Sequence, residues 1–182
     1  MKDEKRICLN KSVLDFMNTV LKQTSSPIVL EFGSGWSSSW FSKRCFKLIT
    51  VETDRKWARI VSDDLQAKDF KNWHMILANP APIVFVSNIN NEMKAIGIGA
   101  EMVDLILIDC RENMRLSATY LGWLFLKKGG WILFDDAQRL QHKNAIDLLT
   151  EKAGQPIRLE WQSGDIDSAK PRLTLAWQKK GG

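Results

Sequence analysis

Three aspartates follow apolar runs, at places where two neighbouring strands of a parallel sheet would end. Asp109 comes after LILI, and Asp135 and Asp136 come after GGWILF. Since ligands of open α/β sheets bind at the carboxyl ends of the strands, the three side chains are expected to share one cleft. Either they supply the oxygen ligands of Mg²⁺, or Asp109 or Asp135 is a catalytic group that orients or deprotonates an acceptor. The structural alternative is that the aspartates cap helices or pair with nearby arginines. Those arginines are Arg111, Arg115 and Arg139.

A glycine-rich turn follows the first apolar run, in the segment PIVLEFGSGWSSSWF over 27–41. The run contains Glu31, and Gly33, Ser34 and Gly35 lead into a helix-compatible stretch. Glycine tolerates positive φ and lets a ligand approach the backbone, and the next helix begins with free N–H groups. The segment therefore predicts a nucleotide-like ligand over the turn. The alternative is a tight turn in which one of the following serines only caps the helix.

An acidic residue closes the next apolar run. Glu52 ends LITVE and follows Gly35 by 17 positions (52 minus 35). A carboxylate at this strand tip can accept hydrogen bonds from the hydroxyls of a ribose, so we predict that Glu52 binds ribose. The alternative is a cap or a solvated charge at the start of a helix, in competition with Thr53 and Asp54.

The elements that must position these residues follow from the hydrophobic pattern. Short runs that are apolar throughout alternate with segments of helical length, as expected for parallel strands covered on both faces. The expected fold is α/β: a doubly wound, mostly parallel sheet with helices on both faces and a C-terminal antiparallel hairpin. The expected strands are Ile28–Phe32, Phe46–Val51, His74–Leu77, Val103–Ile108, Trp131–Phe134, Ile157–Trp161 and Arg172–Gln178, with a late helix over Asn144–Ala153.

We expect the 182 residues to form a single domain with three parts. Residues 1–26 contain an amphipathic helix that covers the sheet, 27–136 form the cofactor-binding core, and 137–182 contain the last helix and the hairpin. The stretch Asn79–Gly99 has NP, AP and GIG steps. It is either a substrate-side loop or a short helix or strand joined by ordinary turns.

Composition argues against several function classes. The three cysteines are widely separated and do not cluster with the two histidines, so neither a zinc site nor a disulfide framework is expected. The longest apolar run is far shorter than the roughly 20 residues of a transmembrane helix. We therefore expect a cytoplasmic protein without a membrane partner. The net charge of +5 comes from 26 basic and 21 acidic residues that are interspersed, which is a weak argument for nucleic-acid binding.

The sequence resembles the class I S-adenosylmethionine-dependent methyltransferases. The resemblance rests on LEFGSGWSS, TVETD, VDLILID and KKGGWILFDD, in that order, and covers 27–136. In such enzymes the acidic-x-Gly-x-Gly turn approaches the methionyl part of the cofactor, the acid after the second strand holds the ribose, and residues after the third strand flank the adenine. The cofactor-binding residues that the resemblance implies are Glu31, Gly33, Ser34, Gly35, Glu52, Ala78, Asn79 and Asp109.

The stretch 108–136 is also similar to the catechol-type, metal-dependent O-methyltransferases. In those enzymes an Asp after the fourth strand and an Asp-Asn pair after the fifth bind the metal, which implies Mg²⁺ at Asp109, Asp135 and Asp136. Two positions depart from that pattern, because Asp136 replaces the usual Asn and Glu112 replaces a frequent catalytic Lys. Metal-independent relatives have an Asp-Gly-Arg-like step, and the DCR step after LILI resembles it.

The predicted function is transfer of a methyl group from S-adenosylmethionine to an unidentified acceptor, expected to be a small molecule. Nucleic acid stays open as an acceptor, and Mg²⁺ as a second cofactor. The alternatives are an NAD(P)-binding Rossmann protein and a noncatalytic nucleotide-binding or interaction module. Glu31 within the first strand, and Ser38 in place of a third small Gly or Ala, both argue against the dinucleotide fingerprint.

Overall fold

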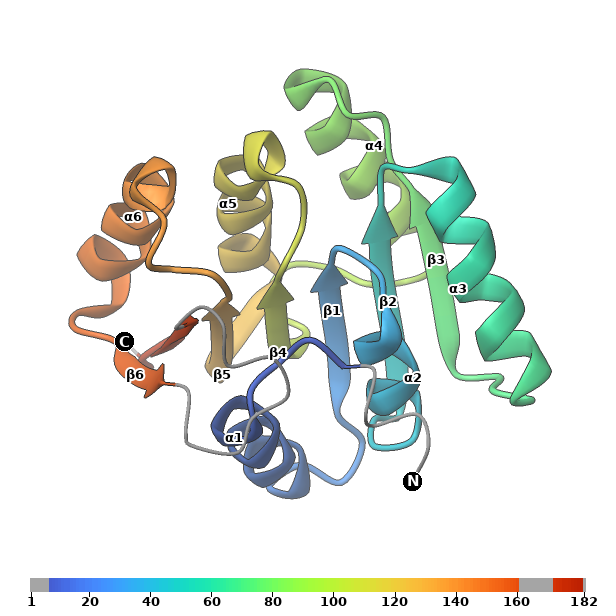
Figure 1. Ribbon diagram of the computed structural model, residues 1–182, viewed down its shortest axis with the longest axis horizontal. Helices are drawn as coiled ribbons and strands as arrows, with labels where there is room; N and C mark the ends of the chain where they lie inside the picture. Colours follow the sequence, from blue (N-terminus) through green and yellow to red (C-terminus); the bar gives the residue numbers. More distant parts are fainter. Residues whose placement is uncertain (1–6, 161–171, 182) are drawn as a thin grey trace.

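The computed structural model describes residues 7–160 and 172–181, and within them seven strands form one sheet. The strand order is β3-β2-β1-β4-β5-β7-β6 (Figure 1). Neighbours among β1 to β5 pair in parallel, whereas β7 pairs antiparallel with both β5 and β6. The predicted α/β fold with a C-terminal antiparallel pair is confirmed. The strands are β1 (Ile28–Phe32), β2 (Lys47–Glu52), β3 (Trp73–Leu77), β4 (Val103–Ile108), β5 (Leu126–Phe134), β6 (Ile157–Glu160) and β7 (Leu173–Gln178).

The order of the strands reverses between β1 and β4. The chain first adds β2 and β3 on one side of β1, and then crosses to add β4 and β5 on the other side. Gly33 directly follows β1 and Asp109 directly follows β4, so these two residues flank the switch point. Ligands of open α/β sheets bind in the crevice outside such a point.

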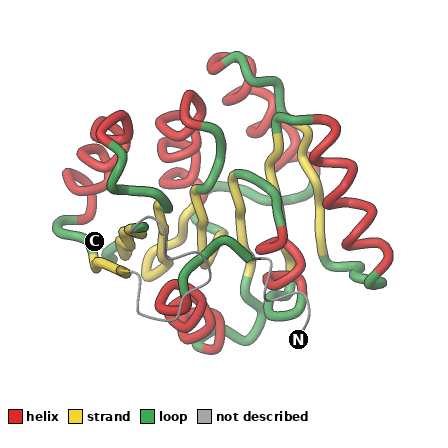
Figure 2. Tube along the Cα trace, in the orientation of Figure 1, coloured by secondary structure: helices red, strands yellow, loops and turns green. Residues whose placement is uncertain are grey.

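Helices cover both faces of the sheet (Figure 2). One buried cluster joins α4, α5 and α6 to the sheet, a second joins α1 and α2 to it, and α3 lies beside α2. Within β1, Leu30 and Phe32 belong to the first cluster and Val29 to the second, so both sides of the strand are buried. This explains the unbroken apolar runs. In the described residues no helix combines the length and the hydrophobicity needed to span a membrane. The helices are α1 (Lys11–Lys22), α2 (Trp36–Ser42), α3 (Arg55–Ala67), α4 (Pro82–Ala95), α5 (Arg115–Phe125) and α6 (Lys143–Ala153), with 3₁₀ turns η2 (Glu112–Met114) and η3 (Leu140–His142).

Two segments differ from the simplest reading of the sequence. The irregular stretch between β3 and β4 contains the 14-residue helix α4, so its interpretation as a loop is wrong and the helical alternative is correct. Strand β5 begins at Leu126, five residues before the predicted start (131 minus 126). The cause is an irregular pairing, because Val103 pairs with Leu126 while Leu105 pairs with Trp131. The intervening KKGG has no strand pattern.

The ends of the chain match the prediction where they are described. Helix α1 begins after Asn10, whose side chain accepts a hydrogen bond from the backbone N–H of Val13 at 2.8 Å. The predicted hairpin is present as β6 and β7. Trp161, the last residue of the predicted sixth strand, lies outside the described residues.

Candidate functional site

The glycine turn joins β1 to α2 and lies against the end of β4. Gly33 has φ +94°, and its N–H donates to the Val51 carbonyl at 2.9 Å. A Cβ atom on Gly33 would lie 2.3 Å from the carbonyl oxygen of Asp109. Glycine is therefore required here by the close approach of the two strand ends. Gly35 differs, because the nearest atom to an added Cβ is Ser37 Oγ at 3.8 Å. Its α-carbon faces open space that a ligand can fill.

Glu31 lies at the end of β1 with none of its surface exposed. Its carboxylate accepts hydrogen bonds from the hydroxyls of Ser37, Ser38 and Thr50. Ser38 Oγ also accepts from the Gly35 N–H at 3.1 Å. Burial raises the pKa of Glu31 from 4.5 to about 7, although the hydroxyl groups lower it. Glu31 thus holds the first turn of α2 through hydrogen bonds to its serines. Ser38 also caps that helix, as expected in the alternative reading of the turn.

A cavity of about 230 Å³ lies over the glycine turn. Ile7 and Leu9, in the segment before α1 (Figure 1), line it, and so do Trp36 and Trp57. The two indole rings meet edge to face, with 6.2 Å between their centroids. Such a mixture of backbone, carboxylate and aromatic surface suits a ligand with polar and flat apolar parts. The lining residues in the described chain are Ile7, Cys8, Leu9, Gly33, Ser34, Gly35, Trp36, Ser37, Trp57 and Asp109.

Glu52 ends β2 with 8% of its surface exposed. One carboxylate oxygen accepts the backbone N–H and the hydroxyl of Ser34, at 3.2 and 3.0 Å. The other accepts the N–H groups of Thr53 and Asp54, at 2.7 and 2.9 Å. A carboxylate has about four acceptor positions, so protein donors occupy its whole capacity. Glu52 therefore ties the glycine turn to the start of α3, and it is not among the residues that line the cavity.

The hydrogen bonds of Glu52 form a brace that joins the glycine turn to the start of α3. Two further contacts from α3 add to this brace. Trp57 donates its indole N–H to the Ser34 carbonyl at 2.7 Å. Asp54 caps α3 by accepting the backbone N–H groups of Lys56 and Trp57, and it pairs with Arg111 at 2.8 Å. The loops after β1, β2 and β4 are therefore linked directly to one another.

Of the three aspartates predicted to share a cleft, Asp109 lines the cavity. Its side chain is 36% exposed, and its Oδ1 lies 3.1 Å from Nη2 of Arg115, which is buried. Partial burial and the nearby Asp135 carboxylate raise the pKa of Asp109, although Arg115 lowers it. Asp109 thus lines the cavity and contacts the buried guanidinium group of Arg115 at the same time.

The two aspartates after β5 have other partners. Asp135 Oδ1 accepts the hydroxyl of Thr174 on β7 at 2.6 Å, and burial raises the pKa of Asp135. Asp136 has φ +55°, pairs with Arg139 at 2.5 Å and accepts the Gln138 amide at 3.3 Å. The arginine pairing proposed as the structural alternative is therefore present for Asp136, as it is for Asp109.

The arrangement does not fit the predicted Mg²⁺ site. In residues 7–160 and 172–181, no group of three His, Cys, Asp or Glu side chains is placed to hold a metal ion. A hard cation requires several convergent oxygen ligands. Here Asp109, Asp135 and Asp136 share one end of the sheet, but two arginines and a threonine bind their side chains. We derive no metal-dependent step from this site.

Solved structures share this architecture. An O-methyltransferase from Bacillus cereus in complex with SAH has a TM-score of 0.71 at 14% identity, over 94% of this chain and 82% of that chain. The O-methyltransferase TomG from Streptomyces achromogenes, in complex with SAM, gives 0.67 at 14% identity, over 96% and 82%. An rRNA methylase from Streptococcus thermophilus gives 0.66 at 11% identity, over 92% and 96%. The chain has the fold of the class I methyltransferases. No protein-family model and no curated protein sequence matches it.

Within this methyltransferase fold, the residues predicted to flank the adenine lie apart from the cavity. They follow β3, which is two strands away from β1. Ala78 is buried, and its N–H donates to the Glu52 carbonyl at 2.7 Å. The Asn79 side chain accepts the Ala81 N–H at 2.9 Å, just before α4. The adenine role of both residues stays a prediction.

Several residues of the site have little signal in the sequence. Ile7 and Leu9 continue the apolar pattern of the N-terminal segment, yet they precede α1 and reach the cavity. Trp57 donates to the Ser34 carbonyl, 23 positions away, and Arg115 donates to the Asp135 carbonyl, 20 positions away. Neither spacing predicts a contact, because both contacts depend on how loops from different strands converge.

Proposed function

We propose that this chain is an S-adenosylmethionine-dependent methyltransferase. The observation that carries the proposal is the cavity at the switch point of the sheet, which Gly33, Ser34, Gly35 and Asp109 line together. Four of the residues assigned to the cofactor from the sequence thus converge on one space. The open side of Gly35 leaves room for a ligand directly against the backbone.

When bound, S-adenosylmethionine supplies a methyl group on a positively charged sulfur atom. The chain itself contributes positioning, which is a major part of catalysis for a direct transfer between two bound molecules. Ile7 and Leu9 line the cavity that would hold the ligand, and Asp109 presents its carboxyl group to that space. We assign the catalytic role to Asp109, with Asp135 as its support, because Asp135 is 3% exposed and bonded to Thr174.

Ribose binding by Glu52 belongs to the same proposal. It requires the hydroxyl of Ser34 to release one carboxylate oxygen, because protein donors occupy all the acceptor positions of Glu52. The brace between the two loops then rearranges when the cofactor enters.

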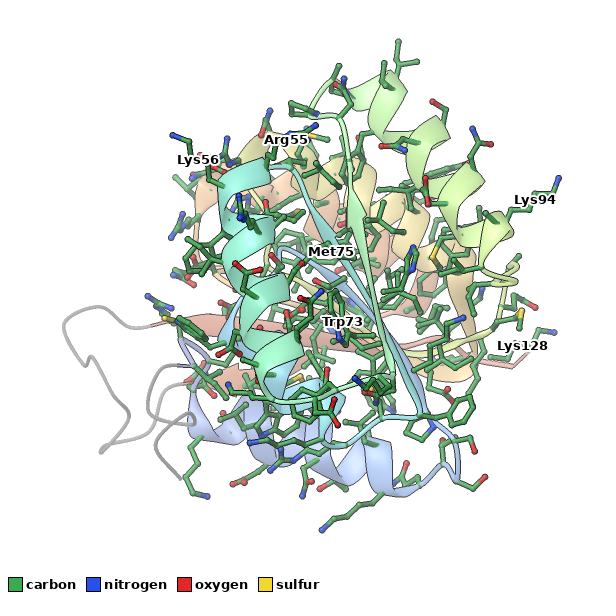
Figure 3. All side chains as sticks on the ribbon, turned by 90° about the vertical axis from the view of Figure 1, so that its right-hand side faces the viewer. Arg55, Lys56, Trp73, Met75, Lys94 and Lys128 are labelled. Carbon is green, nitrogen blue, oxygen red and sulfur yellow. The ribbon has the colours of Figure 1, made fainter. Side chains whose placement is uncertain are left out.

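For the acceptor we propose a small molecule. A nucleic acid requires a continuous basic surface, whereas basic residues within the described part of the chain lie on separate elements. Figure 3 shows Arg55 and Lys56 at the start of α3, and Lys94 and Lys128 on other elements at the opposite side of the view. A cytoplasmic location stays a prediction.

Calorimetric titration with S-adenosylmethionine, its demethylated product SAH and NAD tests the proposal. We expect the first two to bind and NAD to leave no signal. Gly35→Val should weaken SAH binding by about tenfold or more, because its side chain fills the space over the turn. Gly99→Val is the matched control. Gly99 precedes β4, whereas the cavity lies at the end of β4 that leads to Asp109. A folded wild-type protein that binds neither S-adenosylmethionine nor SAH contradicts the proposal.

A further inference from the structure

A buried arginine reaches the strand ends where the metal was expected. Arg115 opens α5 and is 5% exposed. Its Nε donates to the Cys110 carbonyl at 2.9 Å, and its Nη2 donates to Asp109 Oδ1 at 3.1 Å. Its Nη1 donates to the Asp135 carbonyl. One guanidinium group therefore bridges the chain after β4 and the chain after β5.

We propose that Arg115 is the resident cation of this site, a positioning residue that supplies from the protein the positive charge that a metal ion would bring. The inference rests on the proposed methyltransferase function, because it concerns the carboxylate that faces the cofactor cavity. It explains how three aspartates that resemble a metal-binding set can lie at one end of the sheet although their geometry does not fit a metal ion.

Three carboxyl groups lie at the strand ends near Arg115. Asp135 and Asp136 are 3% and 7% exposed, and Asp109 is half-buried. Buried carboxylates are costly unless a positive group or hydrogen-bond donors compensate them. Arg139 compensates Asp136 from the surface, where its own side chain is 48% exposed. Arg115 is the cation that contacts Asp109 within the described residues.

The chemistry of the side chain suits this role. A guanidinium group stays protonated at any pH relevant to the protein, and its rigid fork can bind several acceptors at once. Its central carbon lies 5.2 Å from the centroid of the Phe134 ring, within cation–π range. The Thr119 hydroxyl also bonds the Arg115 carbonyl at 2.7 Å, inside the first turns of α5. Both ends of Arg115 are therefore anchored, and its guanidinium group is held beside Asp109.

Binding of Mn²⁺, followed by electron paramagnetic resonance, tests the proposal without any knowledge of the acceptor. The wild-type protein should bind no Mn²⁺ at the aspartates, and a chelator should leave its SAH affinity unchanged. Arg115→Ala vacates the position of the cation between the Asp109 carboxylate and the backbone carbonyls of Cys110 and Asp135, and it should gain a Mn²⁺ site. That gain should disappear in the double variant Arg115→Ala/Asp109→Asn, and methylguanidinium should compete with Mn²⁺ for the vacated space.

Two variants serve as controls. Arg111→Ala removes an exposed arginine of the same loop, paired with Asp54, and should gain no Mn²⁺ site. Arg115→Lys keeps the charge, so it should also bind no Mn²⁺ and should retain SAH affinity within about threefold. A purely structural arginine would give no metal-binding difference between Arg115→Lys and Arg115→Ala.

Wild-type Mn²⁺ binding that Asp109→Asn abolishes overturns the proposal, and so does a folded Arg115→Ala protein that gains no site. If Arg115→Ala does not fold, the wild-type Mn²⁺ and chelator measurements decide. Failure of the wild-type protein to bind SAH or S-adenosylmethionine is a different result, which contradicts the proposed function and leaves the Mn²⁺ titration interpretable.

Discussion

The buried carboxyl group of Glu31 makes the stability of this protein depend on pH. Burial raises its pKa from 4.5 to about 7, so the folded protein retains a proton that the unfolded chain has already lost in this interval. The stability that this proton contributes is fully present below pH 4.5 and is lost as the pH rises to about 7. A shift of about 2.5 pKa units (7 minus 4.5) corresponds to roughly 3 kcal/mol.

Glu31→Gln removes this titration and keeps the shape of the side chain beside Ser37, Ser38 and Thr50. Relative to wild type, the variant should therefore gain roughly 3 kcal/mol of unfolding free energy between acidic and mildly alkaline pH. Urea denaturation over that range measures the difference between the two proteins. Glu151→Gln, on the exposed side of α6, is the matched control, because it makes the same substitution without burial.

The comparison uses the difference between variant and wild type because other groups also titrate. Burial raises the pKa of Asp135 and lowers that of His142, and these groups contribute equally to both proteins. Asp109 is different, because burial and, among other causes, the charge of Glu31 raise its pKa, so its contribution to the difference belongs to the Glu31 titration. A difference between Glu31→Gln and wild type that stays constant across the range would mean that Glu31 has the same pKa in the folded protein and in the unfolded chain. That result would refute the reasoning.

Three further substitutions test the braces of the site. Gly33→Ala should destabilise the protein by at least roughly 2 kcal/mol in urea unfolding, because its Cβ would lie 2.3 Å from the Asp109 carbonyl oxygen at φ +94°. Gly97→Ala is the control for backbone strain alone, because Gly97 has φ +78° and no neighbour within 4 Å of an added Cβ. Equal losses in the two variants would argue against the close contact. Glu52→Ala should lower both stability and SAH affinity, since hydrogen bonds to a charged group contribute roughly 1.5–3 kcal/mol each; a loss of stability with unchanged calorimetric affinity would limit Glu52 to bracing the turn. Thr174→Val should reduce the unfolding free energy by roughly 1–3 kcal/mol, because it leaves Asp135 Oδ1 without its hydroxyl donor; unaltered stability in urea contradicts this.

The hydrophobic pattern was enough to predict the centre of the sheet. Ile28–Phe32 and Val103–Ile108 match β1 and β4 residue for residue. Both are strands at the centre of the sheet, and burial on both faces produces an unbroken apolar run that a local reading can detect. The start of β5 was not predictable in this way, because Leu126 joins the strand through an irregular pairing with Val103.

The sequence by itself determined which polar residues stand at the ends of the parallel strands. Gly33, Glu52, Asp109 and Asp135 each end or directly follow an apolar run, and parallel topology brings such ends to one edge. This part of the site needed only the order of the elements along the chain.

Only the tertiary structure decided what those residues contact. Glu52 binds the turn at Ser34, 18 positions away, and Arg115 reaches the carbonyl of Asp135, 20 positions away. A hydrogen bond forms only when donor and acceptor approach within about 3 Å and align, and loops from separate strands meet that condition through the packing of the whole sheet. Which groups surround Glu52 and Asp109 is therefore a property of three-dimensional convergence, which the spacing of residues along the chain does not encode.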